Sequence, residues 1–151
     1  MLDPQHSSGL PAFLAARPGV NSGYMIAQYT AAALVAENRV LAHPASVESI
    51  PTSGSQEDHV SMGWGAGRKL SQILDNTARV LAIELMCAAQ GLEYRRPSLP
   101  GPLAGRLWQG IRELVPPLTA DRSFGAEIEE LAGFIESGAL DETAGPAFCQ
   151  G

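Results

Sequence analysis

The chain has 151 residues, enough for one domain with a hydrophobic core, and 45% of them are hydrophobic. Ten basic residues against 16 acidic ones give a net charge of -6. This balance argues against a nucleic-acid partner, because binding phosphates requires clustered lysine and arginine. Alanine, leucine and glycine dominate over aromatic and β-branched residues, which favours helices over sheets. We therefore expect an all-α protein.

A first long helix is predicted from Ser22 to Ala42. Residues 1–20 are interrupted by proline and glycine and are predicted to be irregular. Asn21 or Ser22 would cap the free amides of the helix, and Pro44 would end it. Apolar and small side chains surround most of its circumference. A helix of this kind has to be covered on every side, so we expect partner helices, most simply from other subunits.

A second long helix is predicted from Asp58 to Gln90, after a loop rich in serine, proline, threonine and glycine. Asp58 would cap its beginning and Gly91 its end. Apolar side chains recur at spacings of three and four and predict one buried stripe: Leu70, Ile73 or Leu74, Thr77, Leu81, Leu85 and Ala88. The polar residues of the helix are expected mostly on the opposite side: Arg68, Lys69, Asp75, Asn76 and Arg79.

Two shorter amphipathic helices are predicted beyond a proline-rich linker, at Leu103–Leu114 and Phe124–Ser137. Ser123 would cap the second of these, and Gly138 would end it. The last dozen residues are expected to be frayed. Two cysteines are too few for a disulfide framework, so a reducing compartment, the cytoplasm, is expected. The sequence has neither a secretion leader nor a run of about 18 apolar residues, so no membrane association is expected.

Four polar or ionisable residues, Gln56 to His59, gather where the loop enters the second helix. One interpretation is structural: carboxylates near a helix N-terminus gain about 0.3–1 kcal/mol from the helix dipole. The other is functional, with Glu57 facing a cavity to accept a proton or bind a cationic group. A zinc site is not expected, because the histidines do not have the H-E-x-x-H spacing. Gly63 to Gly67 is a weak match to a nucleotide loop, because no strand precedes it.

Several motifs follow one another in the order found in histidine ammonia-lyases. They are GLPAFL at 9–14, PGVNSGYMIAQYTAAAL at 18–34, LAHPASV at 41–47, IPTS at 50–53 and QEDHVSMG at 56–63. Ordered motifs of this kind are far more specific than any single one. The chain therefore resembles the histidine ammonia-lyase family, closely from about Leu2 to Gln90 and only loosely from Gly91 onward.

The resemblance implies an all-α homotetramer with a central bundle of long helices and shorter C-terminal helices. Residues 1–91 would form the bundle portion, and residues 92–151 the shorter helices and tail of the same domain. Members of the family build each active site from three subunits, which would cover the first helix. They eliminate ammonia from L-histidine without oxidation and release trans-urocanate.

The resemblance also assigns roles to residues in the motifs. Glu57 matches a catalytic glutamate that contacts the imidazole or amine side of the substrate, with proton transfer as a further role. Met25 matches a residue on the wall of the substrate pocket, although simple core packing is an equal interpretation. Gln56 would bind near the substrate and orient the neighbouring carboxylate, while His59 would pack nearby. A glutamate at this position favours histidine over phenylalanine or tyrosine as the substrate.

The family's electrophile, 4-methylidene-imidazol-5-one, is made by cyclisation of an internal Ala-Ser-Gly and needs no external cofactor or metal. No Ala-Ser-Gly occurs in these 151 residues, so we expect the chain to be inactive alone. It would then be a truncated or wrongly started gene product, a fragment, or one half of a split enzyme completed by an N-terminal half. Two alternatives remain: a non-catalytic oligomerisation or complementing fragment, and another aromatic amino acid ammonia-lyase or aminomutase.

Overall fold

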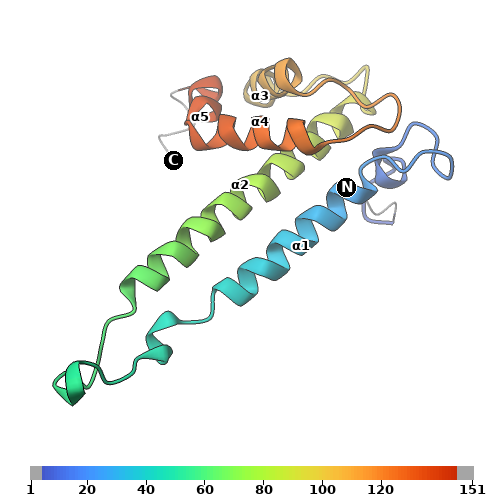
Figure 1. Ribbon diagram of the computed structural model, residues 1–151. Coiled ribbons are helices and arrows are strands. Elements are labelled where there is room, and N and C mark those ends of the chain that lie inside the picture. The colour runs from blue at the N-terminus through green and yellow to red at the C-terminus, as the bar shows by residue number, and fades with distance from the viewer. Residues whose placement is uncertain (1–4, 146–151) are drawn as a thin grey trace.

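The computed structural model describes residues 5–145 (Figure 1). The regular structure in this range is helical, which confirms the predicted all-α fold. Its α-helices are α1 (Met25–Leu41), α2 (Gly63–Glu93), α3 (Pro102–Leu114), α4 (Gly125–Glu136) and α5 (Ala139–Ala144). Short 3-10 helices lie in the connections: η1 (Ala12–Leu14), η2 (Ala45–Glu48) and η3 (Ser53–Ser55).

The two long helices form an elongated arm. α1 and α2 run antiparallel and contact each other, and the connection that contains η2 and η3 lies at the tip of the arm (Figure 1). α3, α4 and α5 gather at the base, beside the C-terminal half of α2 and near the beginning of α1 (Figure 1). No helix within residues 5–145 is long and apolar enough to cross a membrane.

The first helix begins three residues later than predicted, at Met25. Neither Asn21 nor Ser22 caps it. The N-cap residue is Tyr24, whose side chain makes no hydrogen bond to the free amides of the helix. The capping prediction is therefore wrong. Instead, the backbone N–H groups of Ser22 and Gly23 donate to a carboxylate from a distant part of the chain, that of Asp121.

The second helix also begins later, at Gly63, and Asp58 does not cap it. The backbone ahead of it folds back on itself, because the Thr52 N–H donates to the Glu57 carbonyl at 2.9 Å. This bridge keeps the polar motif in a turn outside the helix. At the other end α2 continues through Gly91 to Glu93, so the prediction that Gly91 ends it is wrong. Gly91 is buried among packed helices, and that packing offsets the roughly 1 kcal/mol by which glycine disfavours a helix.

The predicted stripe of α2 is wrong over its N-terminal half, where Leu70 and Leu74 are 55% and 59% exposed, and it is also wrong at Leu81, which is 42% exposed. Most of the residues that α2 buries are small or polar, and Ile83 and Met86 are the large ones: Asn76, Ala78, Ala82, Ile83, Met86, Cys87, Ala89, Gln90 and Gly91. Periodicity detects the apolar side of a helix, but the neighbouring helices decide which side is covered. Here α1 and α4 pack on the side that carries Asn76 and the alanines.

Asn76 was expected on the solvent side, yet it is buried between the two long helices. Its amide donates to the Glu37 carboxylate at 2.9 Å and to the Asn38 side-chain oxygen at 3.0 Å, both on α1. A buried amide requires partners of this kind, because leaving it unpaired would cost about 1–3 kcal/mol. The polar contact therefore fixes the register of α1 against α2.

The C-terminal helices follow the predictions closely, with α3 at Pro102–Leu114 and α4 at Gly125–Glu136. Ser123 does not cap α4, whose N-cap residue is Phe124 without a side-chain bond. Gly138 follows the end of α4 in a left-handed conformation, as predicted, with φ at +80°.

The expectation of a frayed C-terminal end is wrong for α5. The Arg106 guanidinium on α3 donates to the Ala144 carbonyl of α5 at 2.6 Å and so joins the two helices. The structure does not describe Cys149.

The hydrophobic core lies at the base of the arm. Its fully buried side chains come from several elements: Tyr24, Leu14, Met86, Leu131 and Val115. The arm itself is poorly covered, because Ala27 is the buried residue of α1 and large apolar side chains along the arm are exposed: Ile26, Tyr29, Val35, Val40, Trp64, Leu70 and Leu74. As its sequence predicts, α1 is not covered by the chain itself.

We expect Gln90→Ala to lower the free energy of unfolding by about 2–4 kcal/mol, measured by urea denaturation. Buried Gln90 donates to the Leu118 carbonyl at 3.2 Å and accepts from the Leu118 N–H at 2.9 Å. Alanine would leave both backbone groups buried without partners. Gln109→Ala, at an exposed position on α3, is the control and should change stability by less than about 0.5 kcal/mol. Equal effects of the two substitutions would contradict this account.

Candidate active site

Glu57 lies at the tip of the arm, in the turn between η3 and α2, and its side chain is exposed. The Thr52 hydroxyl donates to its Oε2 atom at 3.4 Å, next to the backbone bridge between the same two residues. Ahead of it, Ser53, Gly54 and Ser55 all have positive φ, at 54°, 63° and 71°. Such conformations cost of order 1–3 kcal/mol for a residue other than glycine and often occur at functional sites. The turn therefore presents the carboxylate outward from a tightly bent backbone.

The neighbours of Glu57 share its exposure, and Gln56, Asp58 and His59 are open to solvent. The following segment is tied back to the η2 connection, because the Ser49 hydroxyl accepts from the Val60 N–H at 2.9 Å and donates to the Val60 carbonyl at 3.0 Å. His59 lines a shallow depression of about 360 Å³ with residues 44–46 and 60–63. Gln56 and Glu57 do not line it, so this depression does not unite the polar motif.

Met25 lies at the opposite end of the arm, as the first residue of α1, and is half-buried. The 17 residues of α1 separate it from the connection that leads to Glu57. At a rise of 1.5 Å per residue the helix is about 25 Å long. Figure 1 shows η3 beyond the far end of α1. One chain therefore does not bring Met25 together with Gln56 and Glu57.

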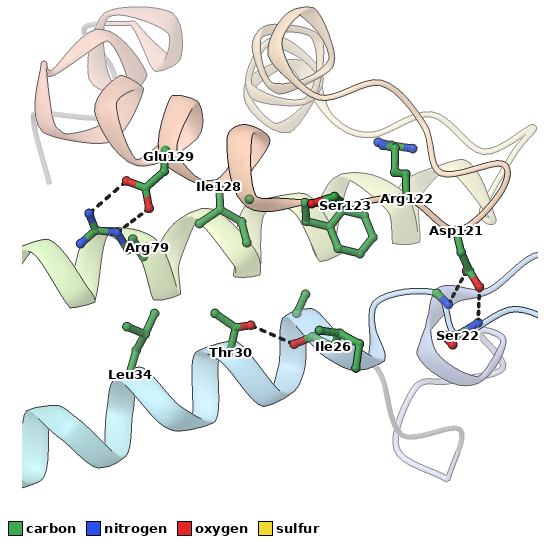
Figure 2. Close-up of a pocket in the computed structure, with 14 residues that line it drawn as sticks. Ser22, Ile26, Thr30, Leu34, Arg79, Asp121, Arg122, Ser123, Ile128 and Glu129 are labelled. Carbon is green, nitrogen blue, oxygen red and sulfur yellow. Dashed lines mark hydrogen bonds and ion pairs between the residues drawn. The ribbon is translucent and has the colours of Figure 1, made fainter.

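A cavity of about 470 Å³ lies at the base, between α1, α2 and α4 (Figure 2). Its walls are mainly apolar, and one end carries an ion pair in which Arg79 donates to both oxygens of Glu129, at 2.7 and 3.0 Å. This bidentate contact lowers the pKa of Glu129. None of the three residues predicted for the site lines this cavity: Glu57, Gln56 and Met25. Its polar groups come from segments far apart in the sequence, among them α2, α4 and the loop between α3 and α4. Arg79 faces this cavity, so the sequence-based prediction that it lies on the solvent side of α2 is wrong.

Two buried groups are excluded as nucleophiles or bases by their surroundings. Tyr24 is fully buried and its ring stacks on Phe124, with centroids 4.8 Å apart. Burial raises the pKa of the Tyr24 hydroxyl to about 12, and burial also raises the pKa of the Cys87 thiol to about 12. Both groups stay protonated at neutral pH. Within residues 5–145 no three histidine, cysteine, aspartate or glutamate side chains are placed to hold a metal ion.

Residues 1–113 match the family model of aromatic amino acid lyases. The chain belongs to the aromatic amino acid lyase family. The family resemblance that the ordered motifs indicate is thus confirmed. The similarity also extends further than predicted, because the match passes Gln90 and continues through α3.

Related lyases and an aminomutase are similar to this chain in sequence or structure over nearly its whole length. A histidine ammonia-lyase from Symbiobacterium thermophilum is 54% identical over 150 residues, which are 97% of this chain and 29% of that protein. The crystal structure of histidine ammonia-lyase from Trypanosoma cruzi superposes with a TM-score of 0.89 at 44% identity, over 95% of this chain and 28% of that one. Tyrosine aminomutase from Streptomyces globisporus gives 0.88 at 39% identity, over 94% and 27%. The chain thus spans less than a third of the length of these lyases and aminomutases.

The pKa of Tyr24 leads to a prediction about alkaline stability. The unfolded chain loses this proton near pH 10, whereas the folded chain keeps it until about pH 12. The stabilisation is complete below pH 10 and is lost as the pH rises towards 12, by up to about 3 kcal/mol. Tyr24→Phe should therefore reduce the fall in the free energy of unfolding between pH 9 and pH 12. Tyr29→Phe, at an exposed position, should leave the fall unchanged, and a similar response of both variants would contradict the prediction.

Proposed function

We propose that this chain is the C-terminal portion of a histidine ammonia-lyase, which eliminates ammonia from L-histidine to give trans-urocanate. The observation that carries the proposal is the identity of about half of all residues with histidine ammonia-lyases over almost the entire chain. The motif Gln56-Glu57-Asp58-His59 supports the same substrate. A carboxylate complements an imidazole or an ammonium group, whereas a phenyl ring offers it no hydrogen bond. The aminomutase structures are less similar in sequence, at 39% identity.

Under this proposal the substrate pocket is shared between subunits. Glu57 and Gln56 lie at the tip of the arm, while Met25 lies at its base, about 25 Å away along α1. They can serve one pocket only if an antiparallel neighbour places its tip beside the base of this chain. The uncovered apolar side chains along the arm, among them Ile26, Tyr29 and Leu74, support such packing. A homotetramer that shares each active site among three subunits satisfies both requirements.

Glu57 is the catalytic residue of this proposal. Its exposed carboxylate, which accepts a hydrogen bond from the Thr52 hydroxyl, would bind the imidazole or amine side of histidine and exchange a proton with it. Gln56 would orient that carboxylate, and Met25 would form an apolar part of the pocket wall. The electrophile that activates the amino acid would come from outside this chain, because its 151 residues contain no Ala-Ser-Gly. A cytoplasmic location belongs to the same proposal and fits a buried free thiol at Cys87.

The proposal predicts that the chain alone makes no urocanate from L-histidine, followed by ultraviolet absorbance. Adding the N-terminal part of a histidine ammonia-lyase, with its Ala-Ser-Gly, should restore turnover. In the restored enzyme Glu57→Gln should lower kcat/KM for histidine by about 10²–10⁴, the usual contribution of a general acid or base. Glu48→Gln, at an exposed position in η2, is the matched control and should have little effect. Turnover that is insensitive to Glu57→Gln would count against recognition of the imidazole.

A non-catalytic oligomerisation fragment is the alternative function, and the uncovered arm favours it as much as it favours the tetramer. Size-exclusion chromatography separates the two. We expect the chain to enter a mixed oligomer with a full-length lyase, and Leu74→Glu to weaken that association because it places a charge on the apolar arm. Arg68→Glu, a charge change at an exposed polar position of α2, is the control. A mixed oligomer that never restores activity would support the alternative, and a monomer would contradict both.

A further inference from the structure

The loop between α3 and α4 contacts the segment that leads into α1. The Ser22 N–H donates to Asp121 Oδ2 at 2.9 Å, and the Gly23 N–H donates to Asp121 Oδ1 at 3.0 Å (Figure 2). Each carboxylate oxygen thus binds one backbone amide. These two hydrogen bonds, with a third from the Asn21 side chain, lower the pKa of Asp121, so the carboxylate is charged at neutral pH.

The same short segment is held from its other side by η1. The Tyr24 N–H donates to the Phe13 carbonyl at 2.9 Å. Gly23 has φ at +56°, and a Cβ atom there would lie 2.4 Å from that carbonyl oxygen, so only glycine fits. The Tyr24 ring then enters the core and stacks on Phe124. Tyr24, which directly precedes Met25, is therefore held both by its backbone N–H and by its side chain.

The loop that carries Asp121 is itself tied to two helices. Arg122 donates to the carbonyls of Pro116 and Pro117, at 2.7 and 3.2 Å, and to Glu127 of α4 at 2.9 Å. Leu118 of the same loop exchanges two hydrogen bonds with the Gln90 side chain on α2. Asp121 thus lies in a loop that Leu118 and Arg122 attach to α2 and α4, and it connects this loop to the start of α1.

We propose that Asp121 is a positioning residue for the substrate pocket, acting through the Ser22–Met25 segment. The inference rests on the proposed function in one respect, that Met25 lines the pocket of a histidine ammonia-lyase. The inference gives the segment after residue 91 a role in the reaction, although all candidate site residues lie before it. If Asp121 served stability alone, its removal would lower the melting temperature and leave the Michaelis constant of the remaining enzyme unchanged.

The contact is tested first by amide hydrogen exchange on the full 151-residue chain. In Asp121→Ala we expect the Ser22 and Gly23 amides to exchange at least tenfold faster, because they lose their acceptors. Asp121→Asn keeps the size of the side chain and one acceptor oxygen, so it should have a smaller effect and guards against misfolding of the alanine variant. Asp141→Ala, at an exposed carboxylate on α5, should leave both amides unchanged. Unchanged exchange at both amides in Asp121→Ala would overturn the inference.

The link to the reaction is tested by a double-mutant cycle in the lyase restored with the N-terminal part. Asp121→Ala should raise KM for histidine about fivefold and change kcat less than twofold, since Glu57 is untouched. Met25→Ala should also raise KM, and the double variant should be no worse than the more impaired single variant, because one residue acts through the other. Additive effects, or an unchanged KM in Asp121→Ala, would overturn the inference while the proposed function stands. If Met25→Ala leaves KM unchanged, the pocket role of Met25 fails, and the inference fails with it.

Discussion

The buried stack of Tyr24 on Phe124 joins the beginning of α1 to the beginning of α4, two points far apart in the sequence. Aromatic pairs of this kind contribute about 0.5–1.5 kcal/mol beyond the area they bury. Both rings belong to the hydrophobic core, so the contact fixes the beginning of α1 to the base. Once α1 is fixed there, its pairing with α2 through Asn76 places the connection and the polar turn at the far end.

Under the proposed function, this geometry means that a single chain would hold only parts of a site. The Glu57 turn and Met25 lie at opposite ends of an arm whose apolar surface the chain does not cover. An exposed apolar surface of this size favours association with another protein surface, and in the proposed tetramer it would be the interface between subunits. The chain belongs to the aromatic amino acid lyase family and spans 29% of the length of a related histidine ammonia-lyase, as the proposed C-terminal portion of such an enzyme would.

Several errors in the predicted local structure have one physical cause, contacts between residues distant in the chain. Ser22 resembles a helix cap, yet Asp121 binds the amides instead. Asp58 resembles another cap, yet the Thr52–Glu57 bridge keeps it outside α2. Leu70 and Leu74 follow a helical period, yet both are more than half exposed, and α2 packs on α1 and α4 with other residues. A local sequence pattern predicts the structure that a segment would prefer in isolation. Such preferences amount to about 1 kcal/mol, and tertiary packing overrides them.

The sequence by itself determined the helical class, the presence of the long and the shorter helices, and the family, because composition, periodicity and ordered motifs are local properties of the chain. It also singled out Glu57, Gln56 and Met25 by their motifs. Only the tertiary structure decided that these residues lie at two ends of an arm and that Asp121 holds the start of α1. Distances of this kind depend on how helices pack, and no spacing within one segment encodes them.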